Sequence, residues 1–220
     1  MPLREPPAPH VLFRLARLPI RGRHLHRIFR ADRSSPWWFA STPSNNGAGG
    51  RFDLPRPEGA CYLSSSPAGA ALEAFQDFGR GVVPLSEMQT RARAEVVAPP
   101  SSPASAQLTS ARARSLGITP ALWSSPDRGL TQRWARALRQ AGWMALWHGT
   151  AHDPTAQTRA VTLFDSAGEH APYGDDAGWT AKTVALDSDD RTKSALARYG
   201  IRIIPDPDPA VVSLEESGLL

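Results

Sequence analysis

The sequence predicts an α+β fold in which helices pack on a bent, mostly antiparallel sheet within a single domain. The chain has 220 residues, which is enough for one domain with its own hydrophobic core. Segments typical of strands and helices are interleaved without the regular βαβ repeat that builds a parallel sheet. The chain also contains 21 prolines, which break long helices and argue against a helical bundle.

The N-terminal part of the chain predicts a tail, a short helix and a strand. Residues 1–10 are rich in proline and are expected to be disordered, so the domain is expected to span residues 11–204. Residues 11–30 mix apolar and basic side chains and predict the helix and the strand. Residues 34–50 combine three aromatic residues with Ser, Asn and Gly, which predicts a loop that borders a ligand site. At the other end, residues 205–220 predict a loosely held tail.

A buried strand followed by a helix is predicted in the next part of the chain. Ala60–Ser64 is a short apolar run typical of a strand. The helix is expected over Pro67–Phe78, because Ser66 can cap its first N–H groups and proline suits its first position. Apolar side chains recur at helical spacing on one face of this helix, so Glu73 projects from another face.

The rest of the domain predicts further short strands and two helices. The strands are apolar runs bounded by turn residues: Ala94–Val97, Met144–Trp147, Ala160–Phe164, Thr183–Leu186 and Ile201–Ile204. Residues 98–106 are rich in Pro and Ser and predict a connection. Asp127–Gly142 is the clearest helix because its apolar side chains lie on one face and Gly142 ends it. Asp190–Tyr199 predicts a second, shorter helix.

Composition excludes several classes of protein. Cys61 is the single cysteine, so no disulfide forms within the chain, and no zinc-ligand pattern occurs. His148 and His152 are close in sequence but have no evident third ligand, so no metal is expected. No apolar run is long enough to span a membrane and no signal peptide is evident, which predicts a cytoplasmic protein. The net charge of +4 is concentrated in arginines over residues 14–33.

Three short motifs carry the functional prediction. Arg51 follows a glycine-rich run, Tyr62 lies 11 residues later in a strand, and Glu73 lies 11 residues after that in a helix. No P-loop or dinucleotide-binding glycine motif is present, which disfavours a kinase or a Rossmann dehydrogenase. In order and spacing, GGRFDLP and GACYLSSSPAGAALEAF resemble the RES domain family. TQRWARALRQAGWMALWHGTAHDP and AVTLFD extend the resemblance, which covers Leu25–Asp165.

The resemblance implies a fold similar to ADP-ribosyltransferases, with NAD⁺ as substrate and no metal. It implies that Arg51, Tyr62 and Glu73 are the catalytic residues. The residues expected to bind NAD⁺ are Arg27, which lies before these motifs, and five residues within them: Arg51, Phe52, Tyr62, His148 and Thr150. Three positions depart from the family, which usually has Ser at Thr150, Tyr at His148 and Arg at Ala151.

Each expected role has a physical reason. Breaking the bond between nicotinamide and ribose passes through an oxocarbenium-like state, which the carboxylate of Glu73 would stabilise. Arg51 would donate two parallel hydrogen bonds to the pyrophosphate, with Arg27 as a second candidate. Tyr62 offers a ring for stacking on nicotinamide and a hydroxyl for the ribose. Thr150 would bond to the same ribose.

The resemblance predicts a toxin that depletes NAD⁺, as a glycohydrolase or a phosphorylase, with an Xre-like antitoxin covering its active site. One alternative is an enzyme that transfers ADP-ribose to a protein. Another is a degenerate RES-like protein that binds a nucleotide or an acidic partner through its arginine-rich front. Neither membrane association nor direct nucleic-acid binding is expected.

Overall fold

The computed structural model describes residues 3–42, 49–75, 81–170 and 178–206. Its main feature is one eight-stranded sheet. In spatial order, its strands are β1 (Arg17–Leu18), β7 (Ser105–Gln107), β8 (Ala145–Gly149), β9 (Arg159–Ser166), β4 (Glu58–Ser64), β2 (His24–Arg30), β6 (Arg91–Val97) and β11 (Thr180–Ala185). All neighbouring pairs are antiparallel except β7 and β8, so the predicted α+β class with a mostly antiparallel sheet is confirmed.

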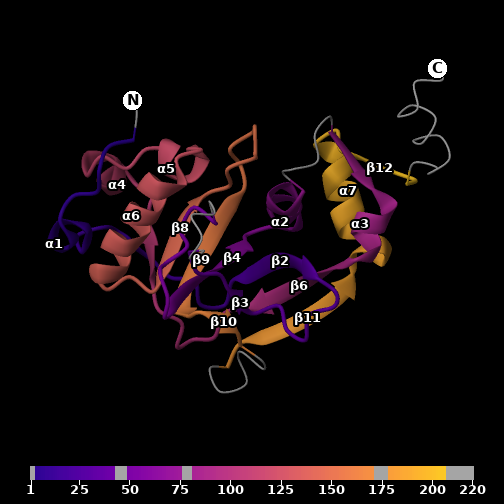
Figure 1. Ribbon diagram of the computed structural model, residues 1–220, viewed down its shortest axis with the longest axis horizontal. Coiled ribbons are helices and arrows are strands. Elements are labelled where there is room, and N and C mark those ends of the chain that lie inside the picture. The colour runs from indigo at the N-terminus through magenta and orange to yellow at the C-terminus, as the bar shows by residue number, and fades with distance from the viewer. Residues whose placement is uncertain (1–2, 43–48, 76–80, 171–177, 207–220) are drawn as a thin grey trace.

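The sheet divides between β4 and β2. These strands share a single residue pair, His26 with Ser64, whereas β4 and β9 pair along their full length. In Figure 1, β8 and β9 run steeply across the view, while β2, β6 and β11 lie more nearly horizontal beneath α2. The two halves therefore diverge along most of β2, and the space between them is where the candidate site lies.

Four helices cover the half of the sheet that contains β8 and β9. They are α1 (Pro9–Leu12), α4 (Ala111–Ser115), α5 (Ala121–Ser124) and α6 (Arg128–Gln140), and Figure 1 shows them grouped together. α6 begins at Asp127, whose side chain accepts a hydrogen bond from the N–H of Leu130. It buries Trp134 and Leu138 in the main core cluster.

The other half of the sheet carries α2 (Pro67–Ala74), α3 (Leu85–Gln89) and α7 (Asp190–Arg198), and a short 3₁₀ helix, η2 (Leu186–Ser188), leads into α7. Beside them, β5 (Val82–Pro84) and β12 (Arg202–Ile204) form a small parallel sheet. Arg93 of β6 and Asp189 are both buried and paired at 2.5 Å. This ion pair joins the start of α7 to the main sheet, and it is well satisfied because Asp189 also accepts from Thr192.

A second small sheet packs beside the main sheet. It joins β3 (Trp38–Phe39) to β10 (Gly168–Glu169). Trp37 and Phe39 are buried, and Trp37 meets Trp179 edge to face at 5.3 Å between ring centroids. The predicted loop over residues 34–50 therefore contains a short strand, and residues 43–48 lie outside the described residues.

Several predicted boundaries differ from the structure. The N-terminal segment predicted as a tail packs on α6 from residue 3: Glu5 pairs with Arg133 at 2.6 Å, and the carbonyl of Arg4 accepts from Trp134. β7 begins within the predicted 98–106 connection, because it gains a partner in β8. α2 ends at Ala74, whereas the sequence predicted a helix as far as Phe78. Residues 76–80, which include the end of that predicted helix, lie outside the described residues. Residues 207–220, which make up most of the predicted C-terminal tail, also lie outside them.

Candidate active site

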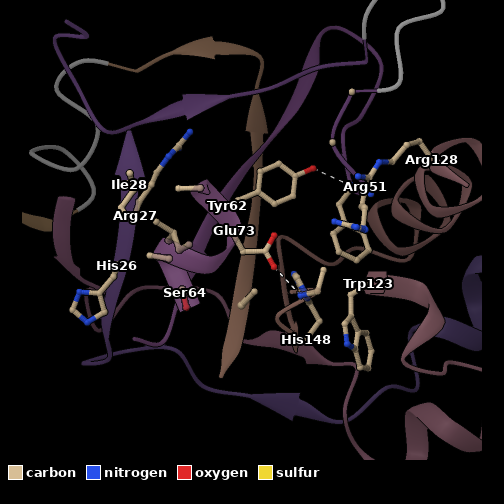
Figure 2. Close-up of a pocket in the computed structure, with 18 residues that line it drawn as sticks. His26, Arg27, Ile28, Arg51, Tyr62, Ser64, Glu73, Trp123, Arg128 and His148 are labelled. Atoms are coloured by element: carbon tan, nitrogen blue, oxygen red, sulfur yellow. Dashed lines mark hydrogen bonds between the residues drawn. The ribbon is translucent and has the colours of Figure 1, made fainter. Parts of the chain in front are cut away.

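A cavity of about 260 Å³ lies where β2 and β4 diverge. Its lining comes from both strands, from α2, from the segment before Phe52, and from the loop that follows β8. Figure 2 shows the side chains of Glu73, Tyr62 and Arg51 turned toward this space from different elements. The three residues singled out by their spacing in the sequence are thus brought together at one cavity.

The carboxylate of Glu73 is held by a backbone contact. Ser66 caps α2 by accepting from the N–H of Gly69 at 3.1 Å, and this start places Glu73 in the last turn of the helix. The N–H of Ala151, in the loop after β8, donates to Oε1 of Glu73 at 2.7 Å (Figure 2). In the described part of the chain, Oε2 makes no hydrogen bond, so it remains free to face a ligand.

Tyr62 anchors the segment that carries Arg51. Its hydroxyl donates to Oδ1 of Asp53 at 2.7 Å and accepts from the N–H of Phe52 at 3.0 Å. The other oxygen of Asp53 accepts from the N–H of Gly50 at 2.6 Å. Burial, followed by the charge of Asp53, raises the pKa of Tyr62, so its hydroxyl stays protonated and able to donate. The hydroxyl predicted to meet the ribose is engaged within the protein.

Gly50 is required by this close packing. A Cβ built on Gly50 would lie within 3 Å of the Tyr62 hydroxyl and of Oδ1 of Asp53. Gln132 of α6 also donates to the carbonyl of Gly50 at 3.0 Å. The segment before Phe52 is therefore fixed by β4 on one side and by α6 on the other.

Two arginines lie on the cavity from separate elements. Arg51 is half-buried, and its Nε donates to the carbonyl of Ser125 at 3.4 Å. Arg128, the first residue of α6, also lines the cavity. Burial and, next, the positive charge of Arg128 lower the pKa of Arg51, while the charge of Glu73 acts in the opposite direction.

Arg27, the second predicted phosphate contact, is engaged elsewhere. It lines the cavity from β2. Its Nη1, however, donates to the carbonyl of Trp38 at 3.0 Å and contacts the sulfur of Cys61. Burial raises the pKa of the Cys61 thiol, although Arg27 acts in the opposite direction. The guanidinium of Arg27 thus ties β2 to β3 and β4.

Phe52 and His148 form an apolar wall of the cavity. Their ring centroids are 4.8 Å apart. Burial lowers the pKa of His148 to about 4, so the ring is neutral at pH 7. Its Nδ1 lies 2.9 Å from the carbonyl of Gly149, and its Nε2 lies 2.9 Å from the hydroxyl of Thr162. Because a carbonyl only accepts, Nδ1 carries the proton and Nε2 accepts from Thr162.

The loop after β8 places Ala151, rather than Thr150, on the cavity. Thr150 is 5% exposed, does not line the cavity, and its hydroxyl has no hydrogen-bond partner among the described residues. The loop is organised by Asp153, whose carboxylate accepts from the N–H and the hydroxyl of both Thr155 and Thr158. Burial raises the pKa of Asp153, but these hydrogen bonds outweigh it and hold the pKa well below its usual range.

Sequence reasoning did not identify three residues at the cavity. Arg128 lies in the predicted helix but was given no role, and Trp123 precedes that helix without a motif of its own. His26 is buried beneath the cavity with its Nδ1 3.2 Å from Nη1 of Arg93. Burial and then Arg93 lower the pKa of His26 to about 4. The position of Arg128 directly after Asp127, where the predicted helix begins, is the sequence signal that could have indicated an anion site.

Two absences hold for the described residues. Across residues 3–42, 49–75, 81–170 and 178–206, no three His, Cys, Asp or Glu side chains are grouped so that they could hold a metal ion. In the same ranges, no helix combines the length and apolar character needed to cross a bilayer.

Comparison with known proteins places the chain in a family. The RES domain model matches residues 24–183. The chain is also similar to one in the crystal structure of the M. tuberculosis MbcT–MbcA toxin–antitoxin complex, with a TM-score of 0.53 and 13% identity. This likeness covers 80% of the present chain and 92% of the other, and at such low identity it shows a common fold. No curated protein matches the sequence.

Proposed function

The chain belongs to the RES domain family, and we propose that it binds NAD⁺ in the cavity and cleaves the bond between nicotinamide and ribose. The observation that carries this proposal is the carboxylate of Glu73. One oxygen is fixed at 2.7 Å by the N–H of Ala151, and the other faces a cavity that also presents Arg51. A fixed carboxylate in a partly buried site stabilises a positive charge that develops beside it.

The proposed reaction uses this electrostatic support at the step that breaks the bond. The bond between C1′ of the ribose and the nicotinamide nitrogen breaks, and its electron pair neutralises the pyridinium ring. The ribose becomes oxocarbenium-like, and Glu73 stabilises that charge. Water or phosphate then adds to C1′; water loses its proton in forming ADP-ribose, whereas phosphate forms the 1′-phosphate.

The remaining lining residues suit the parts of the dinucleotide. Phe52 and the neutral ring of His148 offer an apolar wall for nicotinamide. Arg51, which lines the same cavity, would bind the pyrophosphate with a planar pair of donors. Tyr62 acts through the hydrogen bonds that fix Arg51 and through the ring that it turns to the cavity. The cavity of about 260 Å³ is slightly smaller than the 300–1,000 Å³ typical of ligand pockets, so it would enclose only part of the dinucleotide.

An antitoxin partner forms part of the proposal. The structurally similar chain comes from a toxin–antitoxin complex. We infer that this chain is likewise a toxin and that an Xre-like antitoxin covers its cavity, so that NAD⁺ is spared until the antitoxin is lost. Co-purification with the product of a neighbouring gene, together with loss of NAD⁺ consumption in the complex, is the expected result.

The first experiment compares the wild type with Glu73→Gln. Glutamine has the same shape, and its amide oxygen still accepts from the N–H of Ala151, so the fold and ligand binding are retained. We expect the rate of NAD⁺ loss, followed by chromatography, to fall by about 10²–10³-fold. Glu87→Gln on α3 is the matched control, because Glu87 does not line the cavity and pairs with Arg91 at the surface.

Product analysis with and without phosphate separates the alternatives. ADP-ribose indicates water as the acceptor, and its 1′-phosphate indicates phosphate. Transfer of label from NAD⁺ to a cell protein would replace the proposal with protein ADP-ribosylation. If purified protein without antitoxin consumes no NAD⁺ under either condition and labels no protein, the degenerate binding alternative is correct.

A further inference from the structure

Arg51 and Arg128 both line the cavity, and neither has the acidic partner that six arginines of the described chain have. Arg93, Arg133 and Arg139 each form an ion pair with a carboxylate at 2.5–2.6 Å. No ion pair joins Arg51 or Arg128 to an acid in the described part of the chain. Two positive charges therefore lie at one cavity without a paired carboxylate, and Glu73, which lines the same cavity, acts on Arg51 only through its charge.

The hydrogen-bonding groups of the two side chains are also largely free. Arg51 uses only its Nε, in a long contact with the neutral carbonyl of Ser125. Nη1 of Arg128 is shielded from solvent and has no partner among the described residues. A buried cationic donor without an acceptor is costly, so the arrangement favours an anion that supplies acceptors.

The two side chains reach the cavity from well-fixed positions. Arg51 follows Gly50, which is bonded to Asp53 and to Gln132. Arg128 begins α6, whose cap is formed by Asp127. Figure 2 shows both guanidinium groups on the side of the cavity beyond the Tyr62 hydroxyl, separated from the Glu73 carboxylate. The acidic and the basic groups thus face different parts of one ligand.

We propose that Arg51 and Arg128 together form the binding site for the diphosphate of the dinucleotide, with Arg128 as its second guanidinium. This inference deepens the proposed function and rests on it. A diphosphate presents oxygens on two adjacent phosphorus atoms, which match two planar donor forks. Binding the dianion also removes the repulsion between the two arginines, so both contribute to affinity at once. Arg27 does not take this place, because its Nη1 is bonded to Trp38 and Cys61.

The test measures binding of a ligand series by isothermal titration calorimetry. All variants are built on Glu73→Gln, so that the substrate is not consumed during the titration. The probes are NAD⁺, nicotinamide mononucleotide, nicotinamide riboside and inorganic pyrophosphate, which carry two, one, no and two phosphorus atoms. Arg128→Gln is compared with Arg128→Lys, which keeps the charge but loses the planar fork. Arg136→Gln is the matched control, since Arg136 is an exposed residue of the same helix.

We expect Arg128→Gln to weaken the binding of NAD⁺ and of pyrophosphate by about tenfold or more. Arg128→Lys should lose less, while the affinity for nicotinamide riboside and all affinities of Arg136→Gln should stay unchanged. An unchanged affinity of Arg128→Gln for pyrophosphate overturns the proposal. An equal loss for nicotinamide riboside does so too, because it indicates a general disturbance of the cavity.

The outcomes separate this proposal from the proposed function. If the wild type consumes NAD⁺ but Arg128→Gln binds NAD⁺ normally, the enzymatic proposal stands and the role of Arg128 is refuted. If pyrophosphate binding depends on Arg128 but no NAD⁺ is consumed or bound, the anion site is real and the proposed substrate is wrong. Thermal melting of each variant verifies that the fold is retained.

Discussion

Removing the hydroxyl of Tyr62 should show whether this group has a structural role or a catalytic role at the cavity. It joins the N–H of Phe52 to the carboxylate of Asp53. Tyr62→Phe keeps the ring that faces the cavity and deletes both hydrogen bonds. The N–H of Phe52 and Oδ1 of Asp53 then each lose a hydrogen-bond partner. Asp53 is only 2% exposed, so solvent cannot readily replace that partner.

The expected cost follows from the two bonds. A hydrogen bond to a charged acceptor contributes about 1.5–3 kcal/mol, and a neutral one contributes about 0.5–1.5 kcal/mol. We therefore expect Tyr62→Phe to lower the free energy of unfolding by about 2–4 kcal/mol. For a domain of this size, each kcal/mol corresponds to about 2–4 °C, so Tm should fall by roughly 4–16 °C. NAD⁺ binding should weaken as well, because Arg51 lies in the segment that the hydroxyl fixes.

Urea unfolding and thermal melting provide the assay, with Tyr199→Phe as the control. The Tyr199 hydroxyl makes no hydrogen bond in the described part of the chain and lies outside the cavity, so its loss should be nearly silent. The double variant Tyr62→Phe with Asp53→Asn should cost less than the sum of the single variants, because a neutral amide is easier to bury without the hydroxyl. If Tyr62→Phe melts like the wild type yet loses activity, the hydroxyl acts on the ligand and this reasoning is refuted.

Two further predictions concern the loop after β8 and the buried histidine. Asp153→Ala removes the acceptor of four hydrogen bonds and should cost about 2–4 kcal/mol in urea unfolding. It should also slow NAD⁺ loss by displacing the N–H of Ala151 from Glu73, and normal activity would contradict that link. Burial lowers the pKa of His148 from 6.5 to about 4 in the folded protein. Between these two pH values, His148 is protonated in the unfolded chain but not in the folded protein, so the free energy of unfolding falls as pH falls from about 6.5 to 4. This histidine contributes about 3 kcal/mol to that loss, so His148→Gln should flatten the pH dependence of the unfolding free energy, while exposed His152→Gln should not.

The elements that the sequence predicted best have their own local signals. α6 has apolar side chains at helical spacing and a capping residue, Asp127, and α2 starts at Ser66 as expected. β4, β8 and β9 are runs of apolar residues long enough to recognise. In these cases, short-range physics and the final packing favour the same structure.

The elements that escaped prediction depend on distant partners. α3, α4 and α5 each have at most five residues, too few for a helical pattern to repeat. β7 lies in a Pro- and Ser-rich stretch and becomes a strand by pairing with β1 and β8. Its hydrogen bonds are supplied by chain segments that no local window contains.

The candidate site was predictable where its residues share one stretch of chain. Arg51, Tyr62 and Glu73 fall within a single turn-strand-helix unit, so their spacing carries information on their geometry. Arg128 belongs to a helix far along the chain, and its position at the cavity depends on how α6 packs beside Gly50. The engagement of Arg27 with Trp38 and Cys61 is equally a product of the assembled sheet.

His148, Thr150 and Ala151 differ from the residues usual in the RES family, but these differences leave the support of the Glu73 carboxylate intact. The contact that fixes Glu73 comes from the backbone N–H of residue 151, which every residue except proline supplies. His148 keeps an aromatic ring against Phe52, and its lowered pKa keeps that ring uncharged. The substitutions therefore alter side chains around the cavity while the carboxylate keeps its support. This favours the enzymatic proposal over a degenerate binding protein, since a protein without catalysis has no need to hold a carboxylate oxygen free toward the ligand.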